Sequence, residues 1–200
     1  PPKGGRHEVA AGNDSGGPEA VTARAALAVA ERTATISPCG RYRYRLGRRW
    51  AQHRLSLPLL FVMLNPSTAD AEQDDATVRR CTTFAVAHGF DALEVVNLFA
   101  FRATDPADLW RAADPVGPDA DRHIAEAAAC AGTVCLAYGA QPKAEARVQQ
   151  VLPLLRRRHP WELQCLRITR SGYPQHPLYL PAACRLHPFS PGAIQEAMEP

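Results

Sequence analysis

The chain has 200 residues, of which 46% are hydrophobic and 22% are charged, and a formal net charge of +3. These values are typical of one globular domain with a sizeable core, and the mild positive charge is weak support for an anionic partner. No signal peptide or long apolar span is apparent, and none of the six cysteines forms a CxxC pair, which argues against a zinc or iron–sulfur site. We expect a cytoplasmic protein with reduced thiols, no membrane association and no metal or other cofactor.

The first 38 residues differ from the rest of the chain. Gly- and Pro-rich segments flank an Ala-rich stretch, Ala20–Glu31, which predicts one helix. We expect residues 1–38 to be a flexible N-terminal arm and residues 39–200 to form a single α/β domain. Residues Cys39–Leu46 alternate apolar or aromatic with basic side chains, which predicts an antiparallel edge strand.

Strands and helices alternate along the remaining chain. Apolar runs predict strands at residues 59–64, 92–99, 133–138 and 163–166. Helical spacing and end signals predict helices at residues 75–90, 118–131, 144–158 and 191–198, and a further helix start at Asp105. This order predicts a three-layer α/β/α fold with a central, mostly parallel four-stranded sheet.

Polar loops follow three of the predicted strands. Asn65–Asp70 follows the first strand, Asn97–Asp105 ends the second, and Gly172–Pro177 follows the fourth. Because open α/β sheets bind ligands beyond the carboxyl ends of their parallel strands, we expect these loops to converge on one site.

Two asparagines in these loops are candidates for contacting a heterocycle. The amides of Asn65 and Asn97 both donate and accept, which suits a ring edge that bears a carbonyl and an N–H. Asn also caps turns and helices, so a structural role stays open for each. Asn97 fits such a role less easily, because Asn is depleted from strands.

The first loop also leads into a carboxylate cluster of Asp70, Asp74 and Asp75. Helix capping explains Asp74 and Asp75, which leaves Asp70 as the candidate for orienting a water molecule. His176 lies in a proline-stiffened loop and is a candidate donor to an oxygen that gains charge in a transition state. A metal-dependent hydrolase that uses the three aspartates is a further alternative.

Several motifs resemble known families. The segments FVMLNPSTAD, DDATVRRC, VVNLFAFRATDP, AYG and GYPQHPLYL resemble the bacterial family known as domain of unknown function 1643 (DUF1643), over about residues 59–189. That family name carries no activity.

A more distant resemblance is to the uracil-DNA glycosylase superfamily. MLNPS is similar to its G-I-N-P-G loop, VVNLFAFRATDP to its N-V-V-K-C-R-P segment, and His176-Pro177 to the His-Pro of its last motif. The resemblance implies a uracil-DNA-glycosylase-like fold, with Asn65 in the water-positioning or base-contacting loop, Asn97 as the base-reading amide and His176 at the base carbonyl. Leu64 and Leu178 depart from the glycosylase pattern, which argues against base flipping from a duplex but leaves a pocket for a free base, nucleoside or nucleotide.

Together these observations predict a nucleobase-recognising protein that hydrolyses an N-glycosidic bond in nucleic acid or a nucleotide. The expected catalytic residues are Asn65, Asp70 and His176. The expected substrate-binding residues are Pro66, Ser67, Thr68, Arg80, Asn97, Arg102, Tyr138 and Gly139. The alternative is a non-catalytic nucleic-acid or nucleotide-binding module that uses the same pocket.

Overall fold

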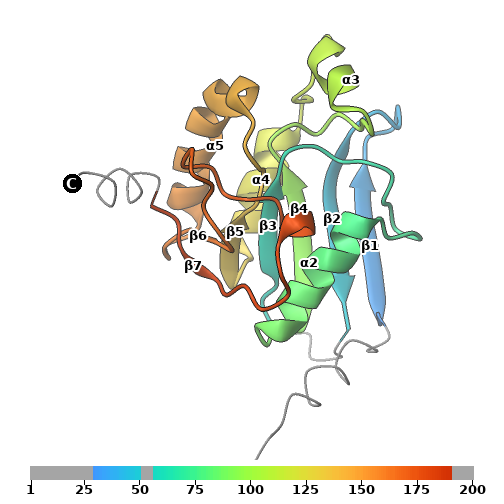
Figure 1. The fold of residues 1–200 in the computed structure, drawn as a ribbon. Helices are drawn as coiled ribbons and strands as arrows, with labels where there is room; N and C mark the ends of the chain where they lie inside the picture. The colour runs from blue at the N-terminus through green and yellow to red at the C-terminus, as the bar shows by residue number, and fades with distance from the viewer. Residues whose placement is uncertain (1–28, 51–55, 191–200) are drawn as a thin grey trace, which may run out of the picture.

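The computed structural model of the chain describes residues 29–50 and 56–190. One seven-stranded sheet, in the order β1-β2-β4-β3-β5-β6-β7, forms its centre (Figure 1). The strands are β1 (Glu31–Ile36), β2 (Arg43–Arg49), β3 (Leu59–Met63), β4 (Ala92–Asn97), β5 (Thr133–Leu136), β6 (Gln164–Cys165) and β7 (His187–Pro188). The helices are α2 (Ala76–Ala87), α3 (Pro106–Arg111), α4 (Ala120–Ala129) and α5 (Glu145–Arg158), with short 3-10 helices η2 (Pro142–Ala144) and η3 (Pro177–Tyr179).

The four predicted strands are β3, β4, β5 and β6, and they pair in parallel. The sheet is nevertheless larger than the predicted four strands, because β1 and β2 extend it beyond β4 and β7 extends it beyond β6, all by antiparallel pairing. The prediction that the segment from Cys39 forms the edge strand is wrong. β1, whose residues fall within the predicted arm, pairs along the outer side of β2 and takes the edge. The predicted helix at 191–198 and most of the arm lie outside the described residues.

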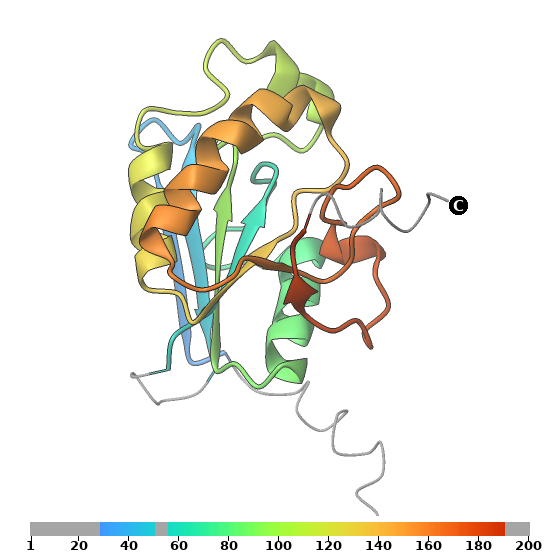
Figure 2. The same ribbon diagram turned by 90° about the vertical axis from the view of Figure 1, so that its left-hand side faces the viewer.

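The elements form three layers (Figure 2). Helix α2 and the chain segment that contains η3 lie on one face of the sheet, and α4 and α5 cover the other. Strand β3 is buried on both faces, because Phe61 packs with Phe84 of α2 whereas Val62 packs with Ile124 and Leu155 of the opposite helices. The apolar run that predicted β3 follows from this burial. Among the described helices, none is long and apolar enough to cross a membrane.

Helix α2 begins and ends where the sequence signals place it. The Asp75 side chain accepts a hydrogen bond from the backbone N–H of Val78 at 2.8 Å, which caps the first turn. Gly89 follows the helix with φ +81°, a left-handed conformation that glycine adopts without strain.

A bulge in β2 decides which side chains reach each face of the sheet. Thr35 pairs with Arg45, but Ile36 pairs with Arg43, so β2 carries one extra residue, Tyr44, at this point. Tyr44 stacks on His123 of α4, with ring centroids 4.7 Å apart. Arg43 instead turns toward the face covered by α2 and contacts the loop that follows β3.

Candidate functional site at the carboxyl edge of the parallel strands

The predicted loops meet in two pairs at the carboxyl edge of the sheet. The loops after β3 and β4 are joined, because the Asn65 side chain donates to the Ala103 carbonyl oxygen at 2.8 Å and the Ala103 N–H donates to the Pro66 carbonyl oxygen at 3.0 Å. The chain after β5 joins the His176 loop through the Gly139 N–H, which donates to Pro174 at 2.9 Å. Since β3 lies between β4 and β5, both pairs face the same edge.

Asn65 therefore has a structural function in this loop. Its amide nitrogen donates to the carbonyl oxygens of Pro66 and Ala103, at 3.0 Å and 2.8 Å. Its amide oxygen accepts no hydrogen bond from the described residues, so only the acceptor half of the amide is available to a water molecule or ligand.

Asn97 is the last residue of β4 and lies opposite Met63 of β3. Leu93 and Val95 of the same strand pack on the α2 side of the sheet. Because side chains alternate along a strand, Asn97 lies on that side too. Asn97 is only 4% exposed, and its side chain forms no hydrogen bond within residues 29–50 and 56–190. The amide atoms of Asn97 are not fully buried, so the unpaired amide is open to water or a ligand at this edge.

His176 presents a neutral donor near this edge. The Leu178 N–H donates to His176 Nδ1 at 3.3 Å, so that nitrogen is unprotonated and the ring proton is assigned to Nε2. Burial lowers the pKa of His176, and the Asp75 charge opposes this only in part. The neutral imidazole therefore offers an Nε2–H donor. The chain after β5 lies close to His176, because a Cβ at Gly139 would be 3.6 Å from the His176 Cβ.

Asp70 stabilises its own loop. Its Oδ1 accepts the N–H groups of Gln73 and Glu72, at 2.9 Å and 2.8 Å, and these bonds lower the pKa of Asp70. Asp70 is thus an ionised turn residue, and its second oxygen is the part that remains able to hold a water molecule.

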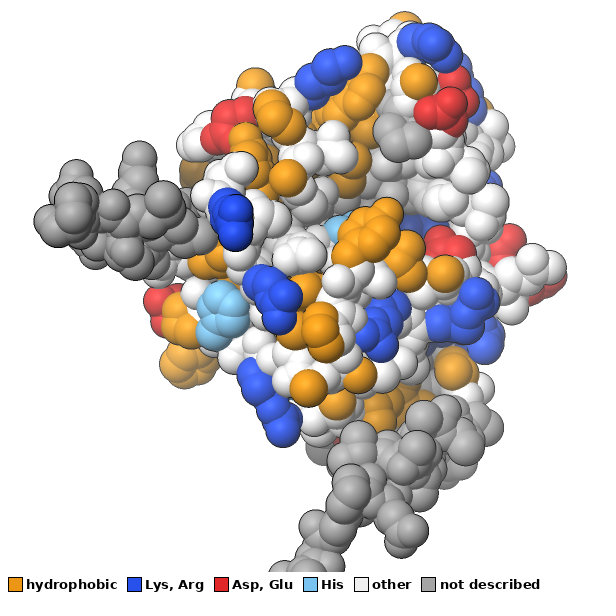
Figure 3. Space-filling model, viewed as in Figure 1, with side chains coloured by type: hydrophobic (Ala, Val, Ile, Leu, Met, Phe, Trp, Pro, Cys, Tyr) orange, Lys and Arg blue, Asp and Glu red, His pale blue; other side chains and the backbone are white. Residues whose placement is uncertain are grey.

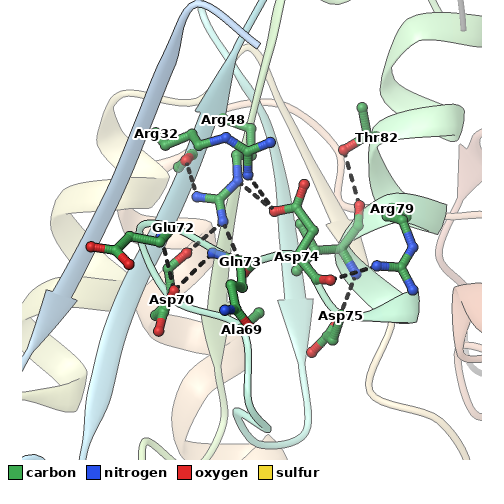
Figure 4. Close-up of polar contacts among 12 residues, drawn as sticks. Arg32, Arg48, Ala69, Asp70, Glu72, Gln73, Asp74, Asp75, Arg79 and Thr82 are labelled. Atoms are coloured by element: carbon green, nitrogen blue, oxygen red, sulfur yellow. Dashed lines mark hydrogen bonds and ion pairs between the residues drawn. The ribbon is translucent and has the colours of Figure 1, made fainter. Parts of the chain in front are cut away.

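The neighbouring aspartates are engaged separately (Figure 4). Asp74 forms ion pairs with Arg48 at 2.7 Å and with Arg32 at 3.0 Å, whereas Asp75 points away from them and caps α2. No group of three or more His, Cys, Asp or Glu side chains that could hold a metal ion is present in the described part of the chain.

The expected substrate-binding residues divide into those that the structure brings together and those that it separates. Ser67, Thr68 and Arg102 line one open cavity of about 250 Å³, which Arg41 also lines. Arg80 instead donates to the Leu180 carbonyl oxygen and holds the chain after η3 on α2.

Tyr138 lies elsewhere. Its side chain packs in the core beneath α4 and α5, on the other face of the sheet from Asn97, and burial raises its pKa. Tyr173 of the His176 loop packs against the same cluster, so Tyr138 lies beneath that loop rather than beside Asn97.

Arg43 is a buried charged residue that is not among the expected catalytic or substrate-binding residues. It is 3% exposed, and its Nη1 donates to the Ala69 carbonyl oxygen at 2.7 Å, while its Nε has no hydrogen-bond partner within the described residues. Burial lowers the pKa of Arg43 to about 10, with Asp75 opposing the shift. The alternation of basic and aromatic residues predicted a strand, and the bulge in that strand turns this arginine toward the face that α2 covers.

Comparison with known proteins identifies a family but no activity. Residues 43–178 match the model of DUF1643, a protein of unknown function, and this range contains Arg43, Asn65, Asn97 and His176. Comparison with curated proteins and with solved structures found no match. Since the family model covers more than half of the sequence, the chain belongs to the DUF1643 family.

Proposed function

We propose that the protein recognises a nucleobase at the carboxyl edge of its parallel strands and hydrolyses the N-glycosidic bond that carries this base. The observation that carries the proposal is Asn97, a residue only 4% exposed at a strand end, whose amide has no hydrogen-bond partner among the described residues and stays accessible at this edge. One amide donor and one amide acceptor match a base edge that presents a carbonyl beside an N–H. The similarity of the loop motifs to the uracil-DNA glycosylase superfamily supports the same assignment.

His176 supplies the second contact to the base. Its Nε2–H donor is directed at a base oxygen, on which negative charge develops as the glycosidic bond breaks. A neutral imidazole donates this hydrogen bond without requiring an acidic pH. The base leaves as an anion and then takes a proton from water.

The two contacts lie at the same edge of the sheet. Asn97 ends β4, and the His176 loop joins the end of β5, on the other side of β3. Tyr179, which is 73% exposed and has its ring centroid 5.7 Å from that of His176, is placed to cover one face of the base.

The attacking water is held from the opposite loop. The free amide oxygen of Asn65 accepts a hydrogen bond from this water, and the free oxygen of Asp70 is the alternative acceptor. The proton that the water loses passes to solvent, which supplies the proton taken up by the base. The water oxygen forms the new bond to the anomeric carbon as the carbon–nitrogen bond breaks.

The test is the release of free base, followed by chromatography. The full chain is incubated with uracil-containing single- and double-stranded DNA and with nucleosides and nucleotides. We expect release by the wild type and a fall of about 100-fold or more in His176→Ala, the usual cost of removing one such donor. Arg111→Gln, a side chain exposed on α3, serves as the matched control. If none of the substrates releases base, or if His176→Ala matches the control, the hydrolytic proposal is wrong.

One observation favours the alternative of a non-catalytic binding module. The carboxylates beside the site are already engaged, since Asp75 caps α2 and Asp70 accepts two backbone N–H groups. A protein of this kind retains base or nucleotide affinity, measured by calorimetry, but releases no base. In that case Asn97→Leu abolishes binding rather than turnover.

A further inference from the structure

Three buried side-chain nitrogens lack hydrogen-bond partners within the described residues: Arg43 Nε, His123 Nδ1 and His159 Nε2. Burial lowers the pKa of both histidines, which keeps their rings neutral at physiological pH. Arg43 stays charged there, because a pKa of about 10 still lies well above neutrality. It is therefore the charged member of the three, and an unmatched buried charge is far more costly than an unmatched neutral nitrogen.

Arg43 lies where the two main loops meet. Its backbone N–H donates to the Ala100 carbonyl oxygen at 2.9 Å, after β4, and its side chain donates to Ala69 at 2.7 Å, after β3. No Asp or Glu in residues 29–50 and 56–190 forms an ion pair with it. The loop from β3 therefore carries a positive charge directly behind it.

The cavity on the other side of this loop is also cationic. Its lining includes Arg41 and Arg102 together with the hydroxyls of Ser67, Thr68 and Thr104, and it includes no Asp or Glu. Neither arginine forms an ion pair with a described carboxylate, and the three hydroxyls form no hydrogen bond within the described part of the chain. Over α2 and the chain that crosses it, Lys and Arg side chains gather, while Asp and Glu lie mostly toward the margins of the view (Figure 3).

We call Arg41, Arg43 and Arg102 the edge cations. The positive charges of Arg43 and Arg102 repel each other, and Arg48 adds to this repulsion. The charges of Asp75 and Asp70 offset part of this repulsion. Like charges that are only partly offset oppose folding, unless an anion binds among them. Planar guanidinium groups and hydroxyl donors are the groups that recognise phosphate oxygens.

We propose that Arg41, Arg102 and the Ser67–Thr68 hydroxyls bind a phosphoryl group, with the positive charge of Arg43 behind the loop adding to the attraction, so that the ligand is a nucleoside phosphate. The identity of its base rests on the proposed function, whereas the phosphoryl site stands on the edge cations alone. Each of the two loops supplies one residue for the base and another for the phosphoryl group. This arrangement favours a single extended ligand that contacts both. The chain after β4 provides Asn97 and then Arg102, and the chain after β3 provides Asn65 and then Ser67.

The experiment is calorimetric titration of the full chain with inorganic phosphate at low salt. We expect Arg102→Gln and Arg43→Met to weaken phosphate binding at least tenfold, while Arg111→Gln binds as the wild type does. Arg111 is the matched control, since it is a surface charge of the same sign in the helix that follows the β4 loop. Circular dichroism establishes that each variant is folded. Absence of phosphate binding, or equal losses in all three variants, overturns the proposal.

A second set of titrations separates the sources of the phosphoryl group. We expect a nucleoside 5′-monophosphate to bind more tightly than the nucleoside and than an oligonucleotide without a terminal phosphate. Tighter binding of that oligonucleotide overturns the assignment to a nucleoside phosphate. Base release from nucleosides as fast as from nucleotides likewise removes the phosphoryl inference and leaves the hydrolytic function. Phosphate binding that depends on Arg102, without any base release, supports the inference and removes hydrolysis.

Discussion

Two arginines of β2, Arg43 and Arg48, share a strand, a face and nearly complete burial, at 3% and 1% exposure. All three nitrogens of the Arg48 guanidinium donate hydrogen bonds. Its Nε pairs with Asp74 at 2.7 Å, and its terminal nitrogens donate to backbone carbonyl oxygens that include Gly47, at 2.7 Å (Figure 4). Arg43 has one side-chain hydrogen bond and no ion pair with a described residue. A buried charge that the protein matches holds the fold together, whereas a buried charge left unmatched points to a ligand.

The largest expected effect is on stability, at the matched arginine. Arg48→Met should lower the free energy of unfolding by about 3–5 kcal/mol, because it leaves Asp74 and several carbonyl oxygens without their buried donor. Urea unfolding measures the change. Arg32→Met, which removes the more exposed partner of the same aspartate, should cost less than about 1 kcal/mol. A loss at Arg48 as small as that at Arg32 would mean that Arg48 does not hold the sheet to the Asp70–Asp74 loop.

The next largest expected effect is on activity, at Asn97, which like Arg43 has a polar group without a partner. Asn97→Leu should reduce base release by about 100-fold or more, equivalent to about 2.7 kcal/mol. The same change should leave stability unchanged or raise it, since no intramolecular hydrogen bond of the Asn97 side chain is lost. Chromatographic rates and urea unfolding test both parts. Unchanged release together with a loss of more than about 2 kcal/mol of stability would make Asn97 a structural residue.

The direct counterpart of Arg48→Met is Arg43→Met. We expect its free energy of unfolding to change by less than about 1 kcal/mol, because the lost bond to Ala69 is offset by removal of an unmatched buried charge. Phosphate affinity should fall at least tenfold in the same protein. A destabilisation as large as that of Arg48→Met would erase the distinction between the two arginines.

The smallest effect concerns His176 and pH. Because burial lowers its pKa, the unfolded chain binds a proton near pH 6.5 that the folded chain binds only at lower pH. Stability should therefore fall as the pH drops below about 6.5. His123 and His159 shift in the same direction, so the measurement is the difference between wild type and His176→Gln in urea unfolding at pH 5 and pH 7. Identical pH dependence in both proteins would place His176 in solvent.

Local sequence patterns predicted the parts of the fold that depend on local interactions. The buried run of β3 and the capped ends of α2 are examples, since burial on two faces and a side-chain cap both leave a signature within a few residues. The edge strand β1 and the two-residue β7 were not predicted, because both depend on pairing with distant strands.

The sequence predicted the candidate site about as well as it predicted the fold. The positions of Asn97 and Gly139 at strand ends follow from the element order. Tyr138 was expected to bind the substrate, but the sequence did not show which way its side chain points. The alternation of side chains along β5 directs it into the core beneath α4 and α5. Arg43 was missed, since its inward direction depends on the register shift between β1 and β2.

The most direct test of a single base-and-phosphate site is calorimetry with a nucleoside 5′-monophosphate, its nucleoside and inorganic phosphate. The wild type, Asn97→Leu, Arg102→Gln and the double variant are compared. We predict that Asn97→Leu weakens nucleoside but not phosphate binding, that Arg102→Gln does the reverse, and that each weakens nucleotide binding. Nucleotide affinity that is unchanged in both single variants would contradict the account.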